Sequence, residues 1–254
     1  MSNLYFNEID PFAAACLAAR FELAAVDARS IANVTAADLT GHNRVHLFGG
    51  IGGWELALQL AGWPDDCPVW TGSCPCQPFS TAGKGKGIKD ERHLWPEMFR
   101  LIRKCRPPVV FGEQVERAIG HGWLDGVFAD LESEGYACGT AVLPACCVGA
   151  PHIRNRIWWV ADAPGDGRER LQRCVAAQIP KDRTLEALDA WHGTGNPFEH
   201  WKKLLAESHV SRVANGVSST VDIRPRLRAY GNAIVPQVAA AFIAAYLEAI
   251  KPQQ

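Results

Sequence analysis

The side chains best suited to covalent chemistry lie in residues 71–92, TGSCPCQPFSTAGKGKGIKDER. Cys76 stands between Pro75 and Pro78, and because proline fixes φ, the thiol is held stiffly. The glycine-rich remainder of the stretch can move. Its lysines, which favour contact with phosphate groups, are Lys84, Lys86 and Lys89. The stretch therefore predicts a cysteine nucleophile that closes over a polyanion.

A carboxylate and two arginines farther along the chain are further candidate site groups. Glu113 follows residues 109–111, an apolar run that predicts a buried strand, and a carboxylate at such a place is a good candidate for function. Arg154 and Arg156 are two residues apart in another predicted strand, so both should face the same side. Their planar donors suit phosphate or base contacts. The alternatives are a structural ion pair for Glu113 and ordinary surface positions for the arginines.

These groups need a scaffold, and the chain predicts alternating strands and helices. Residues 44–48 predict a strand that runs into the glycine-rich turn 49–53, and a helix follows over residues 54–60. This order is typical of a nucleotide-binding unit, because glycine lets the backbone approach the ligand and helix N-terminal amides point at it.

Acidic residues follow two further short strands near the N-terminus. Glu8 comes after residues 4–6, and Asp27 comes after residues 24–26. Strand ends are where α/β sheets place groups that bind a nucleoside, with solvated loops as the alternative for both residues. Asp10, which precedes a proline, predicts the N-cap of a helix.

Composition limits the classes of protein. A chain of 254 residues with 48% hydrophobic content can bury a full core. We expect no membrane span and no export signal, and hence a cytoplasmic protein whose nine cysteines are reduced thiols. The net charge is −1, but residues 81–106 hold eight basic side chains against three acidic ones, so nucleic-acid binding would depend on a local patch.

Several stretches together resemble the cytosine-5 DNA methyltransferase family of bacterial and phage type. The nucleophile loop of that family is matched by PCQPFS, its F-x-E-N-V motif by FGEQV and its Q-x-R-x-R strand by HIRNR. Its motifs for the methionine, ribose and adenine parts of S-adenosylmethionine are matched by HLFGGIGGWELALQLAGW, NEIDPFAAACL and VDARSI, and its closing motif by GNAIVP. His46, Gln114 and His152 depart from the residues usual in the family.

The resemblance implies an α/β fold, a Rossmann-like S-adenosylmethionine-dependent methyltransferase. A mostly parallel sheet flanked by helices would form a catalytic and cofactor-binding domain over residues 1–162. A small irregular target-recognition region would cover residues 163–229, and a C-terminal helix within residues 230–254 would pack back on the catalytic domain.

The order of the motifs is unusual for that family. The ribose and adenine motifs usually follow the glycine-rich motif, whereas here they precede it. Residues 62–72 are too few to hold two strand–helix units between the glycine-rich motif and the nucleophile loop. We therefore predict a permuted sheet, in which the chain makes the usual second strand, then the third, then the first, then the fourth.

The resemblance also implies an activity and a set of residue roles. The activity is methyl transfer from S-adenosylmethionine to carbon 5 of a flipped-out cytosine in double-stranded DNA, through a covalent cysteine adduct at carbon 6, by a monomer without a metal ion. The catalytic residues would be Cys76, Glu113, Arg154 and Arg156. The cofactor would be bound by Glu8, Ile9, Asp27, Phe48, Gly49, Gly50, Ile51, Gly52, Gly53, Trp54, Pro75, Asn232 and Ala233. The DNA would be bound by Gln77, Ser80, Lys84, Lys86, Lys89, Arg226 and Arg228.

Other interpretations remain open. An RNA (tRNA) cytosine-5 methyltransferase would share these motifs, and a catalytically inactive DNA-binding relative would keep the fold. Cys74 is the competing nucleophile. A zinc site would draw on Cys138, Cys146, Cys147 and His152, whose spacing fits no regular ligand pattern. A cysteine hydrolase would need a partner histidine that the sequence does not supply convincingly.

Overall fold

In the part of the chain that the computed structural model describes, residues 3–75, 94–163, 165, 169, 171–174 and 229–250, seven strands form one sheet. They are β1 (Leu4–Asn7), β2 (Ala25–Asp27), β3 (Arg44–Leu47), β4 (Val69–Gly72), β5 (Val109–Val115), β6 (Ala137–Leu143) and β7 (Arg156–Asp162). Neighbouring strands from β2 to β5 are parallel, and β7 runs antiparallel between β5 and β6. The prediction of a mostly parallel sheet is confirmed.

The sheet order is β2-β1-β3-β4-β5-β7-β6. The strand β1 therefore occupies the place predicted for the usual second strand, and β2 occupies that of the usual third strand. The strand β3, which precedes the glycine-rich turn, lies between β1 and β4 in the place of the usual first strand. The predicted permutation is confirmed. Because β1 and β3 pair in parallel with Asn7 opposite Leu47, the ends of these two strands and the turns after them lie side by side.

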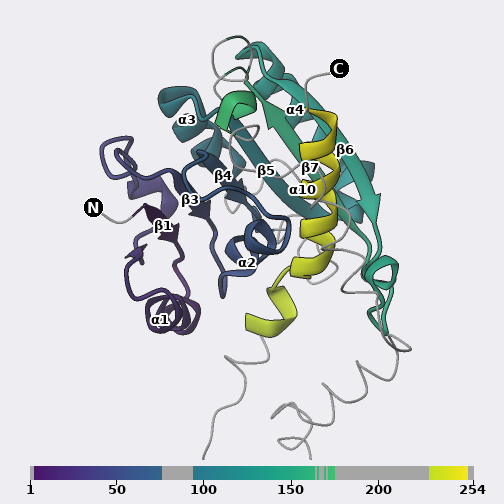
Figure 1. Cartoon of the computed structure of the whole chain (residues 1–254), viewed down its shortest axis with the longest axis horizontal. Coiled ribbons are helices and arrows are strands. Elements are labelled where there is room, and N and C mark those ends of the chain that lie inside the picture. Colours follow the sequence, from purple (N-terminus) through teal and green to yellow (C-terminus); the bar gives the residue numbers. More distant parts are fainter. Residues whose placement is uncertain are drawn as a thin grey trace, which may run out of the picture.

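Helices cover both faces of the sheet. The longer ones in the described residues are α1 (Pro11–Arg20), α2 (Gly53–Leu60), α3 (Trp95–Cys105), α4 (Trp123–Ser133) and α10 (Pro236–Ala249). Shorter 3₁₀ helices cover Ile31–Asn33, Glu116–His121 and Ala145–Val148. The helices α2 and α10 pack on one face, and α3 and α4 pack on the other (Figure 1).

The alternation of strand residues builds two cores. Trp159 and Val110 point into the core beneath α3 and α4, whereas their chain neighbours Trp158 and Phe111 point into the core beneath α2 and α10. Gly112 makes this packing possible, since a Cβ there would lie 2.0 Å from the indole of Trp159. The central strands are thus buried on both sides, which holds their ends rigidly.

Local sequence signals account for where two helices begin. Asp10 caps α1 as predicted, because its carboxylate accepts hydrogen bonds from the amides of Phe12 at 3.0 Å and Ala13 at 3.1 Å. Gly52 is the N-cap residue of α2 and has φ +88°. Glycine adopts this left-handed conformation readily, whereas a residue with a side chain would be strained there.

The C-terminal helix is apolar along its whole length. Residues Ala229–Ala249 are long and apolar enough to cross a membrane, with a mean hydropathy of 1.3. The core helix of a soluble protein passes the same test, and Ile243 and Leu247 of α10 are fully buried in the core that α10 shares with α2.

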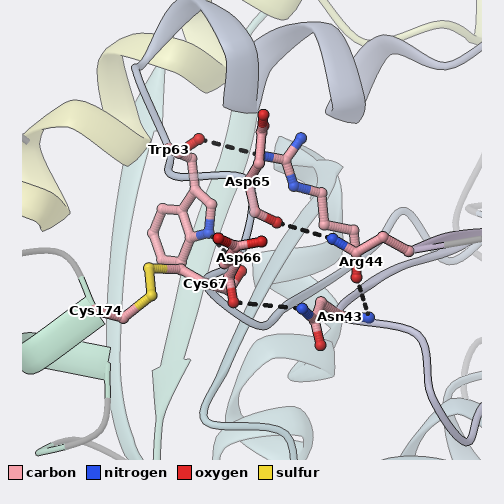
Figure 2. Close-up of a disulfide and its surroundings, with 8 residues drawn as sticks. Asn43, Arg44, Trp63, Asp65, Asp66, Cys67 and Cys174 are labelled. Carbon is pink, nitrogen blue, oxygen red and sulfur yellow. Dashed lines mark hydrogen bonds and ion pairs between the residues drawn. A yellow bond between two sulfur atoms is a disulfide. The ribbon is translucent and has the colours of Figure 1, made fainter. Parts of the chain in front are cut away.

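The prediction that every cysteine is a reduced thiol is wrong for one pair. Cys67 and Cys174 form a disulfide with a Cα–Cα distance of 5.7 Å, although 107 positions separate them in the chain (Figure 2). The sequence could not show this contact, because it depends on how segment 171–174 packs beside the loop before β4. Among the described cysteines, Cys16, Cys74, Cys105, Cys138, Cys146 and Cys147 are free.

Candidate active site

A cavity of about 320 Å³ opens where β1, β3, β4 and β5 end. Its wall brings together segments that are far apart in the sequence. From the predicted cofactor and catalytic set, the lining residues are Glu8, Ile9, Phe48, Gly50, Ile51, Pro75, Glu113, Arg154, Arg156, Asn232 and Ala233. Lining residues that were not assigned a role there include Asn7, Ser30, Ile31, Ser73, Cys74, Gln114 and Gly231.

Some predicted site residues lie elsewhere. Trp54 is buried in the core, and Gly49, Gly52 and Gly53 are not part of the cavity wall. Cys76, Gln77, Ser80, Lys84, Lys86, Lys89, Arg226 and Arg228 lie outside the described residues, as does nearly all of the region 163–229. Their roles stay predictions.

Glu8 connects the end of β1 to the glycine-rich turn. One carboxylate oxygen accepts a hydrogen bond from the amide of Gly50 at 2.7 Å, and the other accepts one from the amide of Asp10 at 2.8 Å. Phe48, between β3 and this turn, has φ +56°, which is uncommon for a residue with a side chain and marks a constrained backbone in the cavity wall.

Asp27 is not among the residues that line the cavity, and its role in cofactor binding stays a prediction. Its carboxylate accepts hydrogen bonds from the hydroxyl of Tyr5 at 2.7 Å and from Nη2 of Arg29 at 2.6 Å. The hydrogen bonds from Arg29 are the main reason that the pKa of Asp27 lies below its usual value. Ser30 and Ile31, the last two residues of the VDARSI motif, line the wall, and their place in that motif was the signal that could have indicated them.

Glu113 lies in the same cavity wall as Gly50 and Ile51 of the glycine-rich turn and is only 8% exposed. Nε of Arg156 forms an ion pair with its Oε1 at 2.7 Å across the antiparallel β5–β7 pair. Burial raises the pKa of the Glu113 carboxyl above its ordinary value of 4.5, although Arg156, Arg154 and the Ser73 hydroxyl partly offset the rise. A buried carboxyl with a raised pKa holds its proton more readily than an exposed one, which suits a group that exchanges a proton or a hydrogen bond with a ligand.

Arg154 does not share a strand face with Arg156, so the predicted alternation is wrong. The strand β7 begins only at Arg156, and Arg154 precedes it with φ +37°. Its Nη2 donates to the carbonyls of Gly231 at 3.1 Å and Ala233 at 2.8 Å. Arg154 therefore fastens the segment before α10 to the cavity wall.

Gln114 stands where the resemblance expects asparagine and makes a brace of its own. Its amide nitrogen donates to the carbonyl of Cys74 at 3.2 Å, while its amide oxygen accepts from the Val115 N–H at 2.9 Å. This contact holds the chain two residues before Cys76. The longer side chain therefore contacts the start of the cysteine-bearing loop.

The competing thiol, Cys74, is poorly placed for nucleophilic chemistry. Its side chain is buried, with Sγ 3.8 Å from Sδ of Met98. Burial raises the pKa of the thiol far above its ordinary value, which disfavours the reactive thiolate.

His46, which differs from the residue usual at this position in the family, lies in the core and does not line the cavity. The ring is fully buried, with Nδ1 2.7 Å from Oγ1 of Thr71 and Nε2 3.1 Å from Oε2 of Glu55. Burial lowers the pKa of His46, so the ring is neutral at pH 7. No group of three or more His, Cys, Asp or Glu among the described residues could hold a metal ion, and Cys138, Cys146, Cys147 and His152 fall within that part.

Residues 1–191 match the sequence profile of the family described as C-5 cytosine-specific DNA methylase. The chain belongs to this family. It is 29% identical over 161 residues to Type II methyltransferase M.HhaI of Haemophilus parahaemolyticus, covering 48% of this chain and 49% of that protein. It is 31% identical over 178 residues to Type II methyltransferase M.AplI of Arthrospira platensis, covering 68% and 48%. The chain thus spans about half the length of these relatives.

Solved structures support the Rossmann-like fold of the family. S. pombe Dnmt2 methyltransferase aligns with a TM-score of 0.54 at 16% identity, over 96% of this chain and 90% of the other. Entamoeba histolytica methyltransferase EhMeth aligns with a TM-score of 0.57 at 13% identity, over 98% and 90%. The predicted fold class and the predicted family are both confirmed.

Proposed function

We propose that this chain transfers a methyl group from S-adenosylmethionine to carbon 5 of a cytosine in double-stranded DNA. The observation that carries the proposal is the buried Glu113–Arg156 pair, which shares one cavity with the glycine-rich turn and with the segment just before Cys76. The family to which the chain belongs and the type II methyltransferases that it resembles support the choice of cytosine and of DNA.

The cavity fits the cofactor that the family uses. About 320 Å³ is within the usual range for small-molecule sites. The wall combines a carboxylate on Glu8 with apolar surface on Ile9 and Phe48, which suits a charged nucleoside-type ligand, and the Gly50 amide holds the Glu8 carboxylate in place. Asn232 and Ala233 close the wall from the C-terminal side. S-adenosylmethionine, when bound, supplies the methyl group.

The chain's own residues would divide the reaction into easier steps. Carbon 5 of cytosine is a weak nucleophile, so we assign the Cys76 thiolate to add to carbon 6, which places electron density on carbon 5. Glu113 would donate a hydrogen bond to ring nitrogen 3 and offset the charge that builds up there. After carbon 5 takes the methyl group, a base from the solvent would remove the carbon-5 proton, the electron pair of that C–H bond would re-form the ring double bond, and the Cys76 thiolate would leave carbon 6.

The target base must leave the duplex, which costs a few kcal/mol. We propose that this cost is offset by phosphate contacts from Lys84, Lys86 and Lys89. Further DNA contacts would come from Gln77, Ser80, Arg226 and Arg228. Arg156 would keep Glu113 in position, and Arg154 would hold the cavity wall closed through the carbonyls that it contacts.

The test is transfer of a labelled methyl group to duplex DNA, with tRNA as the second substrate. We expect labelled DNA, and we expect Cys76→Ala to abolish transfer while cofactor binding remains. DNA that carries 5-fluorocytosine should trap the wild-type protein covalently, because the fluorine cannot leave as a proton does. Transfer to tRNA alone would overturn the DNA assignment, and full activity in Cys76→Ala would overturn the covalent step.

A further inference from the structure

Ser73 lies between the end of β4 and Cys74, and it lines the cavity beside Glu113. Its hydroxyl oxygen lies 3.0 Å from Nε1 of Trp54, which belongs to the first turn of α2. Gly72 pairs with Gly112 in the parallel β4–β5 pair, so the next residues, Ser73 and Glu113, lie side by side in the cavity wall. The Ser73 hydroxyl acts on the Glu113 carboxyl as a hydrogen-bond donor and lowers its pKa. One serine therefore connects the helix after the glycine-rich turn to the candidate catalytic carboxyl.

The direction of these hydrogen bonds follows from the chemistry of the groups. An indole N–H can only donate, so the oxygen of Ser73 must accept from Trp54. The hydroxyl hydrogen of Ser73 is then left to donate, and the Glu113 carboxylate on the adjacent strand is the acceptor that its effect on the pKa of Glu113 indicates. Trp54 thus removes the freedom of the hydroxyl to point the other way.

Packing holds Trp54 in this orientation. The indole is buried, crosses Trp158 edge-on at 5.6 Å between ring centroids and stacks on Phe111 at 6.5 Å. These contacts lie in the core beneath α2 and α10, so the N–H direction is set by the fold and not by solvent.

We propose that Ser73 is a positioning residue for Glu113, and that Trp54 sets the direction of its hydroxyl. The inference rests on the proposed function, because it treats Glu113 as the group that contacts the base. Ser73 supplies a fixed donor to the charged carboxylate and so limits how readily Glu113 takes up a proton. It also holds the carboxyl against the Arg156 side of the cavity.

The groups that face the Glu113 carboxyl in the described structure are few. Arg156 approaches from β7, Arg154 from the loop before β7 and Ser73 from the end of β4. The two arginines act mainly through charge, so their effect falls off gradually with distance. The hydroxyl acts through a directed hydrogen bond, which a single substitution can remove without changing the charge of the site.

The test measures the titration of Glu113 in the free protein by difference infrared spectroscopy. The carbonyl band of the protonated carboxyl is identified as the band that disappears in Glu113→Gln. We expect Ser73→Ala to raise the pKa of Glu113 by about one unit, since a donor to the charged form is lost. Ser73→Thr keeps a hydroxyl and should restore the wild-type titration. Ser133→Ala, on the exposed end of α4, is the matched control and should titrate as wild type.

Trp54→Phe keeps the ring packing but lacks the N–H, and we expect a smaller rise in the pKa of Glu113 than in Ser73→Ala. A Ser73→Ala protein whose Glu113 titrates as in wild type overturns the proposal. A wild-type titration in Trp54→Phe overturns the orienting role of Trp54. Because the spectra need no substrate, they decide this inference even if no methyl transfer is found, and thermal melts check that each variant is folded.

Where transfer is found, the pH profile of kcat supplies a second measurement. The limb on which Glu113 loses its proton should move to higher pH in Ser73→Ala and return in Ser73→Thr. A uniform fall in kcat without any movement of the limb would contradict positioning through the hydroxyl.

Discussion

Two buried glutamates, each paired with an arginine, are held in opposite ways in this protein. Glu55 of α2 is 2% exposed and contacts Nη1 of Arg44 at 2.5 Å. It also receives a hydrogen bond from Gln59 at 2.9 Å and contacts His46. Glu113 of β5 is 8% exposed and contacts Arg156, but it faces the cavity.

The pKa values of the two carboxyls move in opposite directions. Burial raises the pKa of Glu55, but the hydrogen bond to His46 and the charge of Arg44 outweigh it, so the pKa lies below the ordinary value. For Glu113 burial is the stronger effect, and the pKa lies above the ordinary value. Several donors on a buried carboxylate keep it charged and structural, whereas fewer donors beside a cavity leave its proton available for chemistry.

The largest expected effect is a difference in kcat between variants of the two glutamates. Glu113→Gln should lower kcat by about 10²- to 10³-fold, since a hydrogen-bonding group at the charge that develops on the base is changed. Glu55→Gln should keep kcat within a few-fold when measured per folded molecule. Single-turnover methyl transfer checks both, and equal losses in the two variants would remove the distinction.

The second effect concerns stability. Glu55→Gln should lower the free energy of unfolding by about 3 kcal/mol, because it leaves Arg44 buried without a charged partner on α2. Urea unfolding followed by circular dichroism measures this loss. Gln59→Ala, which removes only the neutral donor to Glu55, is the control and should cost less. A Glu55→Gln protein as stable as wild type would show that the pair contributes nothing.

The disulfide is connected to the Glu55 site through Arg44, which pairs with Glu55. Arg44 also donates to the carbonyl of Trp63 at 3.1 Å and to Asp65 at 2.7 Å, in the loop that ends at Cys67 (Figure 2). Cys67→Ser should therefore lower the free energy of unfolding by about 2 kcal/mol and leave the titration of Glu113 unchanged. Reduction of the wild type should reproduce the loss, and Cys105→Ser serves as the free-thiol control. A shifted Glu113 titration would show that the two regions are coupled.

The smallest effect is the pH dependence of stability, whose sign differs between the two sites. The raised pKa of Glu113 makes the folded protein bind its proton more readily, so this group's contribution falls as pH rises from 4.5 through the raised value. The lowered pKa of Glu55 gives a contribution that is present above 4.5 and is lost as pH falls below it. Urea unfolding from pH 3 to 8 should show opposite slope changes in Glu113→Gln and Glu55→Gln, and slopes of the same sign would contradict the assignment.

Much of the fold could be predicted because its signals are local or follow the order of the chain. The cap at Asp10 needs only its neighbours, and the permuted sheet order follows from which motif comes first. Glu113 was singled out because it comes two residues after the end of the apolar run 109–111, and the structure places it in the cavity wall. Arg154 was misplaced because the alternation of a strand was extended two residues beyond the true start of β7.

By itself the sequence determined the family, the kinds of elements and the order in which they enter the sheet, since these depend on residue types read in succession. Only the tertiary structure decided which groups surround each carboxyl and that Cys67 meets Cys174. Ser73 reaches Trp54 across 19 positions, and Gln114 reaches the Cys74 carbonyl across 40. Such contacts depend on side-chain directions that packing sets once distant strands lie side by side, and spacing along the chain carries no record of them.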